Sequence, residues 1–279
     1  MRIGIVGLGL IGGSLGLDLR KFGHQVLGVS RQAQTCQRAI ERGAVDNASI
    51  DFSLLRETDL VFLCTPIAAI APTLKQLVPH LAPETIITDV GSVKAVVVET
   101  ISPLWHNFVG GHPMAGTTET GIEAAQFKLF AGNPYVLTPI ETTPPAAVKI
   151  VEALVRSLTT KVYICKPEDH DRAVAWISHL PVMVSASLID ACTNESDSII
   201  LELARNLTSS GFRDTSRVGG GNPELGVMMA RYNRQSLLDS LHVYRDSLNQ
   251  IIEFVEQEDW QSLEKRLEKA NLERSQFLS

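Results

Sequence analysis

The amino terminus carries a glycine pattern that restricts the chain to a small number of folds. An apolar run, Arg2–Val6, is typical of a buried strand and leads directly into the spacing G-x-G-x-x-G. Glycines in this spacing permit a tight strand-to-helix turn, close approach of a pyrophosphate and close packing of helix on sheet. Free N–H groups at the start of that helix would face the phosphates. We therefore expect a dinucleotide site, formed in this turn by Gly7, Gly9, Leu10, Ile11 and Gly12.

The segments that follow alternate strand-like and helix-like patterns as far as Cys165. Short apolar runs suited to strands are separated by stretches suited to crossover helices, such as Ile11–Phe22 and the segment after Pro144 and Pro145. The further predicted strands are Gln25–Val29, Leu60–Leu63, Thr85–Thr88, Asn107–Gly110, Tyr135–Thr138 and Lys161–Ile164. This alternation predicts an α/β fold in which residues 1–165 form a Rossmann-type, doubly wound, mainly parallel sheet.

Strand-like runs disappear after Cys165, and apolar residues then recur at steps of three and four. Pro167, followed by two acidic residues, predicts a helix start, and Pro181 is expected to kink the long helix that follows. Two later apolar stripes, 237–255 and 260–270, have helical spacing. We therefore expect residues 166–279 to form an all-helical dimerisation domain, whose stripes two copies bury together in a homodimer.

Bulk composition excludes several functional classes. The formal net charge is −6, and this argues against nucleic acid as a partner because phosphate binding calls for a basic surplus. The four cysteines are widely separated, without metal-ligand spacing, so we expect no metal and a reducing compartment such as the cytoplasm. We also expect no secretory leader before the first strand and no apolar run long enough to cross a membrane.

The end of the second predicted strand indicates which nucleotide fits. An acidic residue there would bind the ribose 2′-hydroxyl of NAD, whereas this chain has Ser30 and Arg31. A hydroxyl beside a guanidinium suits a 2′-phosphate, so NADP is expected to be preferred over NAD. The alternative is that Arg31 only begins the next helix in solvent. Thr65 and Pro66, after another strand, are further candidates for cofactor contact.

The segment Gly110–Gly116 reads Gly-Gly-His-Pro-Met-Ala-Gly and contains one titratable side chain. Glycine and proline favour special backbone angles over packing, which predicts a loop that holds His112 in the open. A neutral imidazole beside a hydride acceptor could take the proton that accompanies hydride transfer. The alternative is a solvated histidine in a surface turn.

Three other segments contain candidates for the crevice at the carboxyl ends of the strands. Ser92 could orient a substrate hydroxyl or cap the next helix. His179, within the first long helix of the second domain, would on its own be interpreted as a buried structural histidine. Arg217 could clamp a carboxylate with two hydrogen bonds, whereas Arg213 and Asp214 are interpreted as a local ion pair.

Together these motifs resemble those of the prephenate and arogenate dehydrogenases of tyrosine biosynthesis. The resemblance spans nearly the whole chain and rests on the glycine fingerprint with Asp89–Lys94, Gly110–Gly116, Ser178–Pro181 and Phe212–Arg217, in the family's order. It implies hydride transfer from the ring carbinol of an anionic cyclohexadienol to the nicotinamide, coupled to loss of carbon dioxide. It further implies that His112 accepts the proton of the ring hydroxyl, with Ser92 as its hydrogen-bonding partner. His179 is then implied to be a second histidine of the substrate pocket, and Arg217 to anchor a carboxylate.

Two positions depart from the family pattern. Val182 stands where many members have a second histidine, and the tryptophan that many have near Gly226 is missing. No residue decides between prephenate, which carries a pyruvyl group, and arogenate, which carries an alanyl group. The chain is expected to be the compact form, without a mutase or an amino-acid-sensing domain.

Compact members that use NADP are often arogenate enzymes, so we expect L-arogenate to be converted to L-tyrosine. The alternative is prephenate, which would give 4-hydroxyphenylpyruvate. Two more distant alternatives are a β-hydroxyacid dehydrogenase and a non-catalytic NADP sensor. The chain has no lysine in a glycine-rich helical context after Cys165, which argues against the first, and the combination of His112, Ser92 and Arg217 argues against the second.

Overall fold

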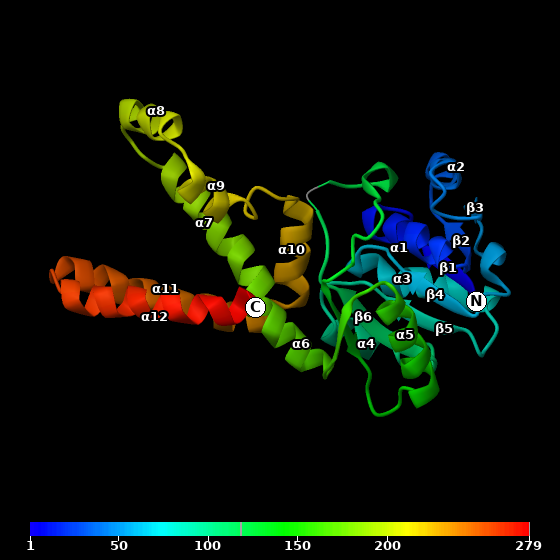
Figure 1. Ribbon diagram of the computed structural model, residues 1–279. Coiled ribbons are helices and arrows are strands. Elements are labelled where there is room, and N and C mark those ends of the chain that lie inside the picture. The colour runs from blue at the N-terminus through cyan, green and yellow to red at the C-terminus, as the bar shows by residue number, and fades with distance from the viewer. Residues whose placement is uncertain (118, 279) are drawn as a thin grey trace. The chain divides into compact units, whose positions relative to one another are not determined.

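An eight-stranded sheet forms the amino-terminal part of the molecule in the computed structural model, which describes residues 1–117 and 119–278 (Figure 1). The strand order is β3-β2-β1-β4-β5-β6-β7-β8, and every neighbouring pair is parallel except β6 and β7. The strands are β1 Arg2–Val6, β2 Gln25–Val29, β3 Asn47–Ser49, β4 Leu60–Leu63, β5 Ile86–Asp89, β6 Phe108–Pro113, β7 Pro134–Thr138 and β8 Lys161–Ile164. The predicted doubly wound, mainly parallel sheet is confirmed.

Helices cover both faces of this sheet because its strands are apolar on both sides. Helices α1 (Leu10–Lys21), α2 (Ala33–Glu41) and α5 (Pro145–Ser157) supply residues to one buried cluster, and α3 (Ile67–Leu77) and α4 (Ala95–Ile101) to the other. Three short 3₁₀ turns occur in the connections: η1 Phe52–Leu55, η2 Val78–His80 and η3 Ile122–Ala124. The strand order reverses between β1 and β4, so the binding crevice of this fold opens beyond the carboxyl ends of these strands.

Only helices follow β8 in the part of the chain that the structure describes. They are α6 Pro167–Val174, a π-helical turn Ala175–His179, α7 Leu180–Thr193, α8 Ser198–Asn206, α9 Ser210–Ser216, α10 Pro223–Tyr232, α11 Arg234–Glu256 and α12 Trp260–Leu278. The expected helical second half is therefore present. By internal contacts, residues 1–233 form one compact unit and the chain from Arg234 onward another. The domain boundary after residue 165 stays a prediction.

The helical segment Pro167–Thr193 corrects one expectation. Its 27 residues, with a mean hydropathy of 1.4 in the most apolar window, are long and apolar enough to cross a membrane by length and composition. The same segment carries His170 and Asp171, which are buried against residues of the sheet. The start of this segment therefore packs against the sheet. Its regular winding is interrupted by the π turn just before Pro181, where the sequence predicted a disturbance.

Candidate active site

The turn after β1 requires glycine at two positions. Gly7 has a φ of +100°, and a Cβ on it would lie 2.5 Å from the carbonyl oxygen of Cys64. A Cβ on Gly12 would lie 2.0 Å from the carbonyl oxygen of Gly7, so helix α1 starts directly against the turn. Above Gly9, by contrast, a Cβ would meet no atom within 4 Å. This combination of a tight turn and open space at a helix start fits a dinucleotide pyrophosphate.

The other predicted cofactor residues lie at the same edge of the sheet. Ser30 and Arg31 follow β2, and the exposed Arg31 makes no ion pair with any described residue. Thr65 follows β4, and its buried Oγ1 has no hydrogen-bond partner in the described chain. Pro66 is exposed and precedes α3. The geometry therefore leaves a free cation and a free hydroxyl beside the glycine turn, which is what a phosphorylated nucleotide needs.

His112 lies on strand β6 and not in an open loop, so that prediction was wrong. It pairs with Val136 of β7, and only 8% of its surface is exposed. The preceding glycines serve close packing: a Cβ on Gly111 would lie 2.7 Å from the carbonyl oxygen of Asp89, and one on Gly110 would lie 2.5 Å from Oγ1 of Thr138. Because the last paired residues of β5 and β6 are Thr88 and Val109, His112 extends past the parallel part of the sheet.

A fully buried ion pair fixes the backbone beside His112. The Lys94 ammonium contacts the Asp89 carboxylate and also donates to the carbonyl oxygen of Gly111 at 2.7 Å. The carboxylate accepts the N–H of Gly111 at 3.1 Å and that of Gly91 at 2.8 Å. Each buried charge is thus both paired and hydrogen-bonded, as burial of an ion requires. Both backbone groups of Gly111 are held by this pair.

A chain of three buried side chains runs from His112 into helix α6. Nδ1 of His112 lies 2.8 Å from Nε2 of His170, and Nδ1 of His170 lies 2.8 Å from Oδ1 of Asp171. The Asp171 carboxylate also accepts the N–H groups of Lys94 at 2.7 Å and Ala95 at 2.9 Å. Sequence analysis did not identify His170 or Asp171, although a histidine followed by an acid just after the last strand was a usable signal.

His179 is completely buried in the π turn, and its two ring nitrogens differ. Nδ1 lies 3.2 Å from Nδ2 of Asn233, which also donates to the carbonyl oxygen of Asp171 at 2.7 Å. Nε2 is buried and has no hydrogen-bond partner among the described residues. A buried structural histidine would have both nitrogens paired. The free Nε2 therefore favours a ligand-binding role for this residue.

The structure contradicts one of the two roles predicted for Ser92. Helix α4 begins at Ala95, and Asp171 binds its first N–H groups, so the prediction that Ser92 caps this helix was wrong. His170 occupies the Nδ1 side of His112, the histidine for which the family resemblance named Ser92 as partner. The Ser92 hydroxyl is buried with no partner in the described chain. It is therefore available to a bound molecule.

Arg217 is exposed immediately after α9. Its segment is attached to α7, because the Ser185 hydroxyl donates to the carbonyl oxygen of Thr215 at 2.8 Å and accepts the N–H of Gly219 at 2.9 Å. No contact between Arg217 and the two buried histidines occurs in the described structure. The local ion pair predicted for Arg213 and Asp214 is confirmed, with 3.5 Å between Nε and Oδ1.

The two positions that depart from the family pattern are neighbours in space. A Cβ on Gly226 of α10 would lie 3.9 Å from Cγ1 of Val182, which is in the first turn of α7. This is an ordinary contact distance, so a side chain at Gly226 could be accommodated without moving Val182. Val182 lies within one helical turn of His179 along α7.

The electrostatic surroundings keep His112 neutral. Burial lowers its pKa well below the usual 6.5, and positive charge on His170, Lys94 and His179 would lower it further. Burial also lowers the pKa of His179, to about 4, against an opposing effect of Asp171. Both imidazoles are therefore uncharged at neutral pH. A neutral histidine can accept a proton at one nitrogen and donate one from the other.

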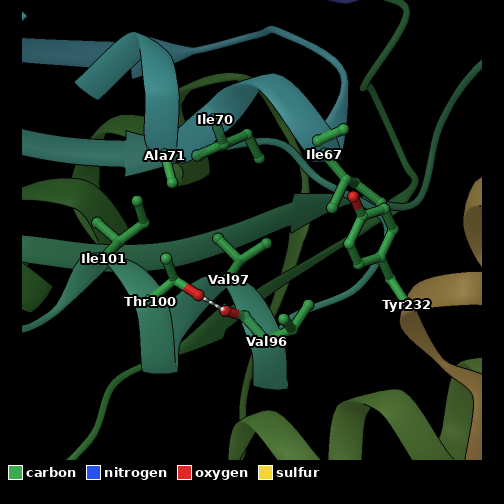
Figure 2. Close-up of a pocket in the computed structure, with 9 residues that line it drawn as sticks. Ile67, Ile70, Ala71, Val96, Val97, Thr100, Ile101 and Tyr232 are labelled. Carbon is green, nitrogen blue, oxygen red and sulfur yellow. Dashed lines mark hydrogen bonds between the residues drawn. The ribbon is translucent and has the colours of Figure 1, made fainter. Parts of the chain in front are cut away.

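An apolar cavity of about 190 Å³ between α3 and α4 is a separate feature (Figure 2). Ile67, Val97 and Tyr232 are among its lining residues. The Thr100 hydroxyl at its wall donates to the carbonyl oxygen of Val96 at 2.6 Å, within helix α4. The cavity therefore offers packing space and no set of converging polar groups, and it is not part of the candidate active site.

Comparison with known proteins assigns both halves of the chain. Residues 15–164 match the model described as prephenate dehydrogenase, nucleotide-binding domain, and residues 166–269 match prephenate dehydrogenase, dimerization domain. The structure resembles that of Synechocystis arogenate dehydrogenase, with 55% identity, a TM-score of 0.89 and coverage of 99% of this chain and 100% of that one.

Two further relatives agree with this assignment. Prephenate dehydrogenase from Aquifex aeolicus, solved in complex with hydroxyphenyl propionate and NAD⁺, is 27% identical with a TM-score of 0.93, over 99% of this chain and 98% of that one. Prephenate dehydrogenase of Bacillus subtilis is 33% identical over 266 residues, which cover 93% of this chain and 71% of that protein.

Proposed function

The chain belongs to the prephenate dehydrogenase family of NAD(P)-dependent oxidoreductases in tyrosine biosynthesis, and from this premise we propose that it oxidises L-arogenate to L-tyrosine with NADP as the preferred cofactor. The observation that carries the choice of arogenate is the 55% identity, over nearly the full length of both chains, to Synechocystis arogenate dehydrogenase. We further propose that the protein acts in the cytoplasm as a homodimer associated through the helices of residues 166–279.

We assign the cofactor to the carboxyl edge of β1, β2 and β4. The glycine turn would hold the pyrophosphate, and the free Arg31 guanidinium with Ser30 would bind a 2′-phosphate. Thr65 and Pro66 would line the nicotinamide side. When bound, the nicotinamide supplies the carbon that accepts the hydride. The absence of an acidic residue after β2 supports NADP over NAD, since a carboxylate there would repel the 2′-phosphate.

His112 is the proposed base. Hydride departure from the ring carbinol makes the hydroxyl more acidic, and a neutral imidazole at hydrogen-bond distance can then take its proton. The depressed pKa keeps this imidazole uncharged, which supports the role. Cleavage of the bond to the ring carboxylate releases carbon dioxide and returns an electron pair to the ring. The electron pair leaves the former carbinol oxygen as a phenolate, and His112 can give the proton back to it to form the phenol, so that proton count and charge balance.

The remaining candidates are assigned to substrate binding. The unpaired hydroxyl of Ser92 would orient the ring hydroxyl toward His112, and the buried Nε2–H of His179 would donate to a substrate oxygen. Arg217 would anchor a carboxylate, because its guanidinium has no competing partner in the described chain. These assignments fit an anionic cyclohexadienol and apply equally to prephenate.

Four spectrophotometric rates test the proposal: NADP or NAD, each with arogenate or prephenate, at one pH. We expect the highest kcat/KM for arogenate with NADP. A higher value for prephenate would refute the substrate assignment, and a higher value for NAD would refute the cofactor assignment. Absence of activity with all four pairs would contradict the enzymatic function itself.

A further inference from the structure

His112, the proposed base, has a hydrogen-bond partner at the ring nitrogen opposite the one that would face the substrate. We propose that Asp171 and His170 are positioning residues that fix His112 in one tautomer, with its proton on Nδ1 and its lone pair on Nε2. The relay is formed by the 2.8 Å contact between His112 and His170 and the 2.8 Å contact between His170 and Asp171. This inference rests on the proposed role of His112 and concerns what makes that role available.

The direction of the relay follows from its donors and acceptors. Asp171 accepts three hydrogen bonds, from the N–H groups of Lys94 and Ala95 and from Nδ1 of His170, as an ionised carboxylate does. Nδ1 of His170 must therefore carry a proton, because a lone pair there would face a carboxylate oxygen at 2.8 Å. In a neutral imidazole the second nitrogen is then an acceptor. The proposed relay has His170 in this neutral form, so that its Nε2 accepts a hydrogen bond from Nδ1 of His112.

The consequence for His112 is a lone pair at Nε2. This nitrogen makes no hydrogen bond to any described residue, so it is the one free to face a substrate. In the opposite tautomer, Nε2 of His112 would carry the proton and could not act as a base, while Nδ1 would oppose the lone pair of His170. Which nitrogen of a histidine reacts is commonly set by the bond at the other nitrogen. Here that bond is buried at both ends.

Burial makes the relay rigid. His170 is 2% exposed and Asp171 is 4% exposed, and the two rings of the histidine pair meet edge to face with centroids 5.0 Å apart. Asp171 cannot turn away without leaving the first N–H groups of α4 unpaired. Its backbone carbonyl is also held by Asn233. Asp171 is therefore fixed at its carboxylate by the start of α4 and at its backbone by Asn233, which follows α10.

The charges around His112 come from several elements. Lys94 and Asp89 form a neutral pair at the end of β5, His179 lies in the π turn, and the relay approaches from α6. Among these groups, the relay alone makes a direct side-chain hydrogen bond to the His112 ring in the described structure. Removing His170 should therefore change the tautomer of His112 while leaving the Lys94–Asp89 pair in place.

The test combines imidazole ¹⁵N NMR of the histidine-labelled protein with kinetics. In the wild type at neutral pH we expect His112 to be protonated at Nδ1 and unprotonated at Nε2, and the reverse pattern would overturn the proposal. This measurement needs no variant and no turnover. Inactivity toward arogenate and prephenate would thus refute the proposed function, whereas the ¹⁵N signals of His112 would still show whether the relay exists.

Variants of His170 provide the second measurement. In His170→Leu we expect the Nδ1-protonated form of His112 to lose its majority and kcat to fall by about 10²-fold, the lower end of what a positioned base contributes, with KM changed by less than about threefold. His170→Gln keeps an oxygen that can accept the Nδ1 proton and should recover part of the loss. Val174→Ala, one turn along α6 and equally buried, is the matched control for packing.

The outcomes separate positioning from packing. Recovery of kcat by glutamine but not by leucine, together with a normal kcat in Val174→Ala, supports the relay. Equal kcat values in His170→Leu and Val174→Ala, with the His112 tautomer unchanged, would overturn it. If His170→Leu does not fold, the wild-type tautomer and the His170→Gln kinetics still decide between these results.

Discussion

Nδ2 of Asn233 lies 3.2 Å from Nδ1 of His179, and this contact gives the two buried site histidines opposite polarity. The amide group must present its nitrogen here, because the same atom donates to the carbonyl oxygen of Asp171. Nδ1 of His179 is therefore an acceptor and Nε2 carries the proton. In the proposed site, His112 would offer an acceptor to the substrate and His179 a donor. The acceptor on His112 would suit a substrate oxygen that loses a proton, and the donor on His179 would suit one that gains negative charge.

Replacing the proposed base should separate binding from turnover. In His112→Asn we expect kcat to fall by about 10² to 10⁴-fold with little change in the KM of the cyclohexadienol, because asparagine can hydrogen-bond but cannot accept the proton. Initial rates with reduced cofactor followed by absorbance provide the measurement. Near-normal turnover would remove His112 from the mechanism.

The pH dependence of kcat should report the buried environment of His112. Because burial holds its pKa well below 6.5, the neutral base is already fully formed at pH 6.5. We expect kcat to be flat from about pH 6.5 upward and to fall only at lower pH, as the imidazole becomes protonated. A half-maximal rate at or above pH 6.5 would contradict the assignment of the acid limb to this residue.

Protein stability should also decline toward acid pH. His112 and His179 both have folded-state pKa values below the unfolded value of 6.5, that of His179 at about 4. Between these values the unfolded chain binds more protons than the folded one, so stability is fully present above pH 6.5 and is lost as pH falls through the folded pKa values. Thermal unfolding between pH 7.5 and 4 checks this. His179→Gln should show a shallower decline in Tm than the wild type, and an identical slope would refute the contribution of His179.

Cofactor preference should depend on one exposed cation. In Arg31→Ala we expect the KM for NADP to rise about tenfold or more, with the KM for NAD changed by less than about twofold, because only NADP loses a charged hydrogen bond. Arg156→Ala on α5, another exposed arginine, is the control. Equal effects on both cofactors would show that Arg31 does not read the 2′-phosphate.

Substrate affinity should depend on Arg217 more than turnover does. In Arg217→Ala we expect the KM for the cyclohexadienol to rise by about 10-fold or more while kcat changes by less than about threefold, since the lost hydrogen bonds act in ground and transition states alike. As the control, Arg213→Ala in the preceding helix α9 removes an arginine that is already paired with Asp214. An equal KM in the two variants would refute the anchoring role.

The parts of the fold that local pattern decides were predictable from sequence. The glycine turn, the alternating strands and the switch to helices after β8 each depend on residues close together in the chain. His112 was misplaced because its glycines resemble those of a loop, whereas they are needed where β6 passes Asp89 and Thr138. That requirement arises between strands and is invisible in local composition.

The relay was missed for a related reason. His112 and His170 are 58 residues apart, and their contact depends on how α6 packs against the end of β6. Glu168 and Asp169 before His170 were assigned to a helix start, which the structure confirms, and the histidine was not considered further. Arg217 was identified by sequence, yet within the described chain it makes no hydrogen bond to either of the two histidines. Long-range packing, and not residue type, decides these relationships.

The neighbouring positions Val182 and Gly226 lie where the chain has room for a different residue. A Cβ at Gly226 meets only a methyl group at 3.9 Å, so alanine fits there without displacing a described neighbour. The relay and the ion pair lie on other residues and tolerate no such freedom. A combinatorial library restricted to these two codons would therefore vary the packing between α7 and α10 while the residues of the relay and of the ion pair stay unchanged.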